Sequence, residues 1–114
     1  MLIVLICFLN PLNSIEILSR SPSSITVREG EVLELFCEAS SHYQWCYWEH
    51  NTLKYLTTAP KDFEEVIEET DLGFLWKKTN TKCGLILENV TEQHAGTWKC
   101  QLANTDARHP NDIR

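Results

Sequence analysis

Cysteines are the residues of this chain that can form covalent bonds with one another, because a pair of them can form a disulfide in an oxidising compartment. The chain of 114 residues contains five of them, and an odd number cannot all pair within one molecule. Cys7 lies in the apolar run Leu2–Leu9, which is too short to cross a bilayer and is followed by a proline and small polar residues. This pattern is typical of a secretory signal peptide, so we expect residues 1–14 to be removed and residues 15–114 to form the domain.

Removal of the apolar run would simplify the cysteine chemistry. Without Cys7, four cysteines are left, an even number that suits disulfides in an oxidising compartment. No Lys or Arg precedes the run, which leaves a membrane anchor or a misassigned start as the alternative. The expected location is extracellular, either secreted or at the cell surface.

Histidines are the other residues that could perform chemistry, as metal ligands or as acid–base groups. His42, His50, His94 and His109 fall in predicted loops or at strand ends. None has the close Cys or His neighbour that a zinc site uses, and the sequence contains no glycine-rich phosphate loop, nucleophile elbow or His-x-x-x-His pair. We therefore expect no enzymatic activity, no metal and no cofactor.

The acidic residues are concentrated in one segment. Residues 62–71 hold six acids and no Lys or Arg, in a chain whose formal net charge is −6. This charge gives no reason to expect binding to nucleic acid or to an anionic membrane. The simplest interpretation of the segment is a solvated loop. Phe63, Val66 and Ile67 have the i, i+3, i+4 spacing of a helical turn, and a strand also fits, so loop, helix and strand stay open.

Two stretches alternate with the period of a β-strand that is buried on one face. In Leu33–Ala39 the leucines share a face with Cys37, and acids occupy much of the other face. In Cys83–Cys100 an alternating half is followed by a polar turn, a glycine and a second alternating half. Tyr43–His50, between these stretches, is the most aromatic part of the chain. The pattern is typical of β-strands joined by turns.

Cys83–Cys100 resembles strand E, the E–F corner and strand F of an immunoglobulin domain. Leu85, Leu87 and Gly96 stand at positions of the family pattern. The chain departs from that pattern twice, because His94 stands where the family usually has Asp and Trp98 where it has the corner tyrosine. An indole can donate a hydrogen bond but cannot accept one, so Trp98 is expected to keep the packing and to lose or reroute the tyrosine's hydrogen bond.

The resemblance implies an all-β fold, an immunoglobulin-like sandwich of two antiparallel sheets. Cys37 then lies on strand B and Trp48 on strand C, and the long stretch between Trp48 and Cys83 favours a variable-type domain. Residues 101–114 contain no alternating apolar segment. Strand G is therefore expected to be missing or truncated, which would leave strand F with an unpaired edge.

Within that fold, the resemblance implies two disulfides, Cys37–Cys100 and Cys46–Cys83. If Trp48 points into the core, Cys46 points inward beside it and can meet Cys83 from the facing sheet. If Trp45 points inward instead, Cys46 faces solvent, so we choose Trp48. The residues expected in the core are Trp48, Leu35, Leu85, Leu87 and Trp98.

The same orientation of strand C predicts a partner surface. With Trp48 inward, Tyr43, Trp45 and Tyr47 should lie on the outer face of the sheet, where a row of aromatic residues requires a cover. The cover could be a protein partner, or it could be local, from Tyr55 or from the acidic segment folded back. If the row only serves as scaffold, the loops at His42 and at residues 104–106 are the alternative partner sites.

The resemblance implies a role in recognition, but it does not identify a particular ligand. We expect an extracellular recognition or adhesion module of an immunoglobulin-superfamily cell-surface receptor, with a protein partner that could be another such domain or a second copy. The alternative is a soluble secreted factor that binds a hormone, a growth factor or a microbial surface. Contact with a membrane is expected only through a segment downstream of this sequence. Asn89-Val90-Thr91 is an N-glycosylation sequon, so Asn89 is expected to carry a glycan.

Overall fold

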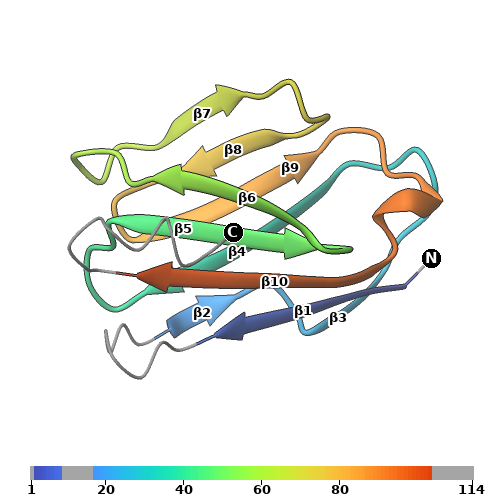
Figure 1. Cartoon of the computed structure of the whole chain (residues 1–114), viewed down its shortest axis with the longest axis horizontal. Coiled ribbons are helices and arrows are strands. Elements are labelled where there is room, and N and C mark those ends of the chain that lie inside the picture. The colour runs from blue at the N-terminus through green and yellow to red at the C-terminus, as the bar shows by residue number, and fades with distance from the viewer. Residues whose placement is uncertain (1, 9–16, 104–114) are drawn as a thin grey trace.

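The structure is a computed structural model that describes residues 2–8 and 17–103, with only the backbone for residues 5–8. Within these ranges, ten strands and one 3-10 turn form two five-stranded sheets that face each other (Figure 1). The front sheet has the order β3-β1-β10-β5-β6, and the back sheet has the order β2-β4-β9-β8-β7. The predicted all-β sandwich is confirmed.

The strands are short and follow the alternating segments of the sequence. In the front sheet they are β1 (Leu2–Phe8), β3 (Ser24–Thr26), β5 (Trp45–His50), β6 (Leu53–Thr58) and β10 (Gly96–Ala103). In the back sheet they are β2 (Ile17–Arg20), β4 (Leu33–Ala39), β7 (Val66–Glu69), β8 (Leu75–Lys78) and β9 (Lys82–Leu87). Neighbouring strands pair antiparallel, except that β1 runs parallel to β10.

The core lies between the sheets and is built from the inward residues of the alternating strands. The residues expected there are each no more than 2% exposed: Leu35, Trp48, Leu85, Leu87 and Trp98. Burial of such large side chains supplies most of the driving force for folding. The indole Nε1 of Trp48 is buried and has no hydrogen-bond partner among the described residues, so this residue contributes packing rather than polar contacts.

A disulfide between Cys46 and Cys83 joins the two sheets, as predicted. Cys46 lies on β5 of the front sheet and Cys83 on β9 of the back sheet, with their Cα atoms 6.5 Å apart. Both cysteines are fully buried. Trp48, two residues after Cys46, therefore also points inward, and the choice between the two tryptophans is decided in its favour.

The predicted Cys37–Cys100 bridge is not present in this structure. Cys100 is a buried free thiol, and burial raises its pKa well above the ordinary value. Cys37 is disulfide-bonded, but not to Cys100. The side chain of Cys7 lies outside the described part of the chain. The cysteine pairing therefore differs from the prediction in a structure that still contains the N-terminal run. We expected this run to be absent from the mature domain.

The N-terminal run forms strand β1 and fills the place beside β10. Its residues Ile3 to Phe8 are in register with Gly96 to Gln101, and its first residues also pair antiparallel with β3. Ile3 is fully buried and belongs to the core. The edge of β10, which we expected to be unpaired, is therefore paired in this structure, by a segment from the other end of the sequence.

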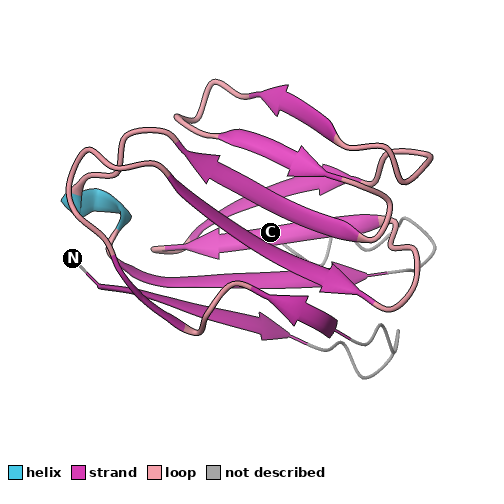
Figure 2. Cartoon of the chain, turned by 180° about the vertical axis from the view of Figure 1, so that it is seen from behind, coloured by secondary structure: helices cyan, strands magenta, loops and turns pink. Residues whose placement is uncertain are grey.

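The turn before β10 forms the corner that the resemblance predicted, with His94 and Trp98 as its side chains. The 3-10 turn η1 (Glu92–His94), cyan in Figure 2, lies at one end of the sandwich. The indole Nε1–H of Trp98 donates to the carbonyl oxygen of His94 at 2.9 Å, so the corner hydrogen bond is rerouted rather than lost. The backbone N–H of Thr91 donates to Nδ1 of His94 at 2.9 Å, which requires that this nitrogen carries no proton.

His50 supports the corner from β5. Its ring stacks on Trp98 with centroids 4.1 Å apart and an interplanar angle of 6°, and its Nε2 is 2.8 Å from the carbonyl oxygen of Ala95. The pKa of His94 is lowered by desolvation and, to a smaller extent, by the neighbouring His50. The folded chain therefore favours a neutral His94.

We expect the double substitution Cys46→Ala/Cys83→Ala to destabilise the domain substantially. The bridge spans a sequence separation of 37 residues, and the chain-entropy account gives a loss of about 3–4 kcal/mol for a loop of this size. Chemical denaturation of the variant and the wild-type chain measures this difference. An unchanged free energy of unfolding would show that the bridge does not restrain the unfolded chain.

The corner predicts a pH dependence of stability. Because the pKa of His94 is lower in the folded chain than the ordinary value of about 6.5, the unfolded chain takes up a proton more readily. This contribution to stability is complete above about pH 6.5 and is lost as the pH falls through the folded pKa. The melting temperature should therefore fall between pH 7.5 and pH 5.

His94→Asp is the matched control for this titration. An aspartate can still accept a hydrogen bond from the Thr91 N–H, but it titrates near pH 4. The variant should have a shallower dependence of melting temperature on pH over the same range. Equal slopes for the variant and the wild-type chain would contradict the assignment to His94.

Candidate functional site

The outer face of β5 carries two of the three aromatic residues predicted there. Trp45 and Tyr47 alternate with the inward residues Cys46 and Trp48, so they point away from the core. Tyr43 does not join them and is 3% exposed within the core. Its hydroxyl donates to the carbonyl oxygen of Lys82 at 3.2 Å, and burial raises its pKa. Tyr43 precedes the first residue of β5, so the alternation of the strand does not extend to it.

The outer aromatic residues differ in how much they expose. Tyr47 is only 6% exposed, whereas Trp45 is half-buried. Tyr55, expected as a local cover, faces the other way and packs edge-on against Phe74 with ring centroids 5.1 Å apart. The acidic segment does not cover the row either, because its strand β7 belongs to the back sheet. Trp45 is therefore the accessible aromatic residue of the predicted partner face.

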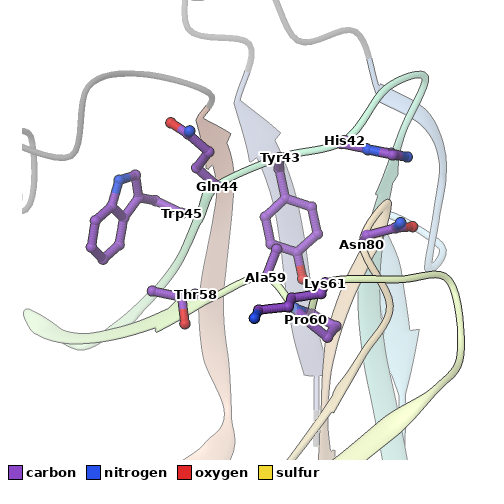
Figure 3. A pocket seen from close by; sticks show the side chains of 9 residues that line it. All are labelled: His42, Tyr43, Gln44, Trp45, Thr58, Ala59, Pro60, Lys61 and Asn80. Carbon is purple, nitrogen blue, oxygen red and sulfur yellow. The ribbon is translucent and has the colours of Figure 1, made fainter.

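A cavity of about 380 Å³ opens beside Trp45, at the end of the sandwich where three loops meet. Figure 3 shows Tyr43 in the middle of its lining, with Trp45 to one side, Asn80 to the other and Lys61 below. The remaining lining residues are His42, Gln44, Thr58, Ala59 and Pro60. The loop at His42, the alternative partner site, thus forms part of this cavity. Residues 104–106 lie outside the described part of the chain.

Backbone hydrogen bonds between the loops hold the cavity in shape. The Gln44 N–H donates to the Ala103 carbonyl at 2.8 Å, and the Gln44 carbonyl accepts from the Ala59 N–H at 3.2 Å. The Tyr43 N–H donates to the carbonyl of Asn80 at 3.2 Å. Because each loop is bonded to another loop or to β10, the site is formed before any ligand arrives.

A buried lysine connects the wall of the cavity to the back sheet. Lys78 is 4% exposed, and its Nζ donates to Thr57 Oγ1 at 2.7 Å and to the Thr58 carbonyl at 3.0 Å. The same ammonium is 2.7 Å from a carboxylate oxygen of Glu68 on β7. A buried charge needs such partners, because its transfer out of water is costly.

Two residues of the lining carry a buried polar atom that the described part of the chain leaves without a hydrogen-bond partner. These atoms are the amide Oδ1 of Asn80, a residue that is 6% exposed, and the buried indole Nε1 of Trp45. Lys61 is exposed and makes no ion pair with the described residues. Lys61 and the aromatic side chains of the lining are suited to polar and apolar contact with a ligand, whereas the two buried polar atoms are covered in this structure.

Sequence reasoning missed Lys61 and Asn80. They are far apart in the sequence and are brought together only by the backbone bonds between loops, and no local pattern marks them. Two further residues named from the sequence, Asn89 and His109, lie away from the cavity lining or outside the described residues. Asn89 is exposed in the turn after β9, consistent with access to the sequon. His109 lies outside the described residues.

The described residues contain no cluster of metal-ligating side chains and no membrane-spanning helix. No three or more His, Cys, Asp or Glu side chains are grouped closely enough in residues 2–8 and 17–103 to hold a metal ion. No helix in the same ranges is both long and apolar enough to cross a membrane.

Comparison with known proteins identifies the family. The chain matches the family described as immunoglobulin V-set domain over residues 20–112, most of its length. No curated protein matches the chain significantly. V-set domains are typically extracellular or cell-surface modules of protein recognition. The match, the two facing sheets, the inward Trp48 and the corner at Trp98 agree with one another, and the chain therefore belongs to the immunoglobulin V-set family.

Proposed function

We propose that the chain is an extracellular recognition or adhesion module of an immunoglobulin-superfamily cell-surface receptor, and that it binds a protein partner at the loop end around Trp45. The observation that carries the proposal is the preformed cavity beside a half-exposed tryptophan, with an exposed lysine in its lining. Tryptophan is enriched at the energetic centres of protein interfaces, where it buries a large apolar area and keeps one polar group.

The outer face of the front sheet extends this site. Leu56 on β6 lies opposite Tyr47 in the register and is exposed, so an apolar surface continues from Trp45 along β5 and β6. A partner that covers the cavity and this strip would desolvate Trp45 on both sides. Another V-set domain or a second copy of the chain is the partner class that fits a sheet face of this kind.

The proposal includes an N-terminal leader and a glycan. Residues 1–14 would serve as a signal peptide, and Asn89 would be glycosylated in the secretory pathway. Exposure of Asn89 supports the second expectation. The alternative, a soluble secreted factor for a hormone, a growth factor or a microbial surface, uses the same cavity and differs in whether the domain is anchored to a cell.

The substitution Trp45→Ser tests the site. The recombinant domain, displayed as a multimer, is measured against a panel of extracellular domains and against itself. A ligand found for the wild-type chain should lose at least about tenfold in affinity, since a central tryptophan is typically worth 2 kcal/mol or more. Val32→Ser, which also removes an exposed apolar side chain, should leave binding unchanged. Equal affinities for Trp45→Ser and the wild-type chain would exclude this loop end as the site.

Processing in a secreting cell tests the leader. We expect mass spectrometry of the secreted chain to show a new N-terminus near Ser14. With Cys7 removed, Cys37 and Cys100 are the two cysteines outside the Cys46–Cys83 bridge, and both are fully buried on facing sheets. A non-reducing peptide map should then contain the Cys37–Cys100 pair. An intact N-terminus, or a free thiol at Cys100 in the processed chain, would contradict this part of the proposal.

A further inference from the structure

β7 is the last strand of the back sheet, at the side away from β2, and one of its edges is open among the described strands. β7 pairs with β8 and with no other strand of the described residues, and Figure 1 shows it at the boundary of the sandwich. The acidic segment, residues 62–71, is therefore centred on a strand, which settles the choice left open by the sequence. A strand with one free edge presents unpaired backbone N–H and C=O groups, and a further strand can pair with them.

Large apolar side chains are exposed along this edge. Phe63 is 83% exposed, Ile67 is 55% exposed and Leu72 is 60% exposed. Ile67 and Glu69 point to the outer face of the back sheet, because they pair with Lys77 and Leu75, whereas Glu68 pairs with the core residue Trp76. Ile67 lies on β7 itself, Phe63 precedes the strand and Leu72 follows it, so the apolar patch that a partner at this edge would cover is centred on Ile67.

The charges around the patch determine which partner can approach. Glu68 is paired with Lys78 at 2.7 Å, and Glu65 is 4.0 Å from Lys77. The other four acids of the segment make no ion pair with the described residues: Asp62, Glu64, Glu69 and Asp71. Edge strands are usually protected against unwanted pairing by charge, and here the protecting charge is entirely negative. A second copy of this chain would bring the same negative edge, which disfavours edge-to-edge self-association.

We propose that the edge of β7 binds an extended segment of another protein, in which Lys or Arg residues alternate with apolar residues, by addition as a further strand. The backbone of the segment would pair with the free edge of β7. Its apolar residues would lie beside Ile67 on the outer face, and its cations would point to the other face, toward Glu68 and the acids in the segments that flank β7. This site is separate from the loop end at Trp45 and does not depend on the function proposed there.

The first test uses defined peptides with the isotope-labelled full chain. The probe is an eight-residue peptide of alternating lysine and valine, and its control replaces each lysine with glutamate. We expect the basic peptide to shift amide resonances of residues 62–71, with an affinity that weakens as salt is raised. The acidic peptide should cause no shift. Equal effects of the two peptides, or shifts confined to other parts of the chain, would overturn the proposal.

The second test separates strand addition from simple attraction between charges. Two further versions of the basic peptide carry N-methyl groups on alternate residues, one on the odd and one on the even positions. In an added strand only alternate N–H groups face the protein. One version should therefore lose binding and the other should keep it. If both versions bind alike, the peptide does not pair with β7.

The third test uses matched charge changes on the chain. Glu64→Lys/Glu69→Lys should weaken binding of the basic peptide by about tenfold, because two attractions become repulsions. Glu29→Lys/Glu88→Lys changes the net charge equally at exposed acids elsewhere and should leave the affinity within about twofold. Thermal melting verifies that both variants are folded. Equal losses in the two variants would assign the binding to net charge alone and overturn the proposed edge site.

Discussion

The direction in which β5 presents its side chains determines most of what this domain can do. Because Cys46 is bonded to Cys83 across the core, β5 cannot be shifted by one residue relative to the back sheet without breaking that bond. The orientation places Trp48 in the core and Trp45 on the outside. A single covalent constraint therefore separates the tryptophan that stabilises the fold from the one that is available to a partner.

The parts of the structure that could be predicted from the sequence are those that depend on alternation within one strand. The inward positions of β4, β5 and β9 follow from a period of two, and the Cys46–Cys83 bridge follows once the strands are assigned to facing sheets. Tyr43 was misplaced because the alternation was extended past the start of β5. The loop-end cavity could not be predicted, since its shape depends on backbone bonds between loops that are distant in the sequence.

The N-terminal run occupies the edge of β10 that faces away from β5. β5 pairs antiparallel with one edge of β10, and on the other edge β1 pairs with it in the parallel direction. The sequence properties that suggest a signal peptide, a short and uninterrupted apolar run, are also those of a buried strand. Local pattern alone cannot distinguish these two roles, and we expect Cys37 and Cys100 to pair only if the run is removed.

Lys78 contacts residues of both proposed binding surfaces. Its ammonium is shared between Glu68 at the β7 edge and Thr57 and Thr58 beside the cavity. A cationic ligand that binds Glu68 would compete with the buried ammonium of Lys78 for this carboxylate. The ammonium would then depend more on its hydrogen bonds to Thr57 and Thr58, and these bonds would restrain the wall of the cavity that contains Thr58. Occupation of one surface would then alter the free energy of binding at the other, and the effect must be equal in both directions.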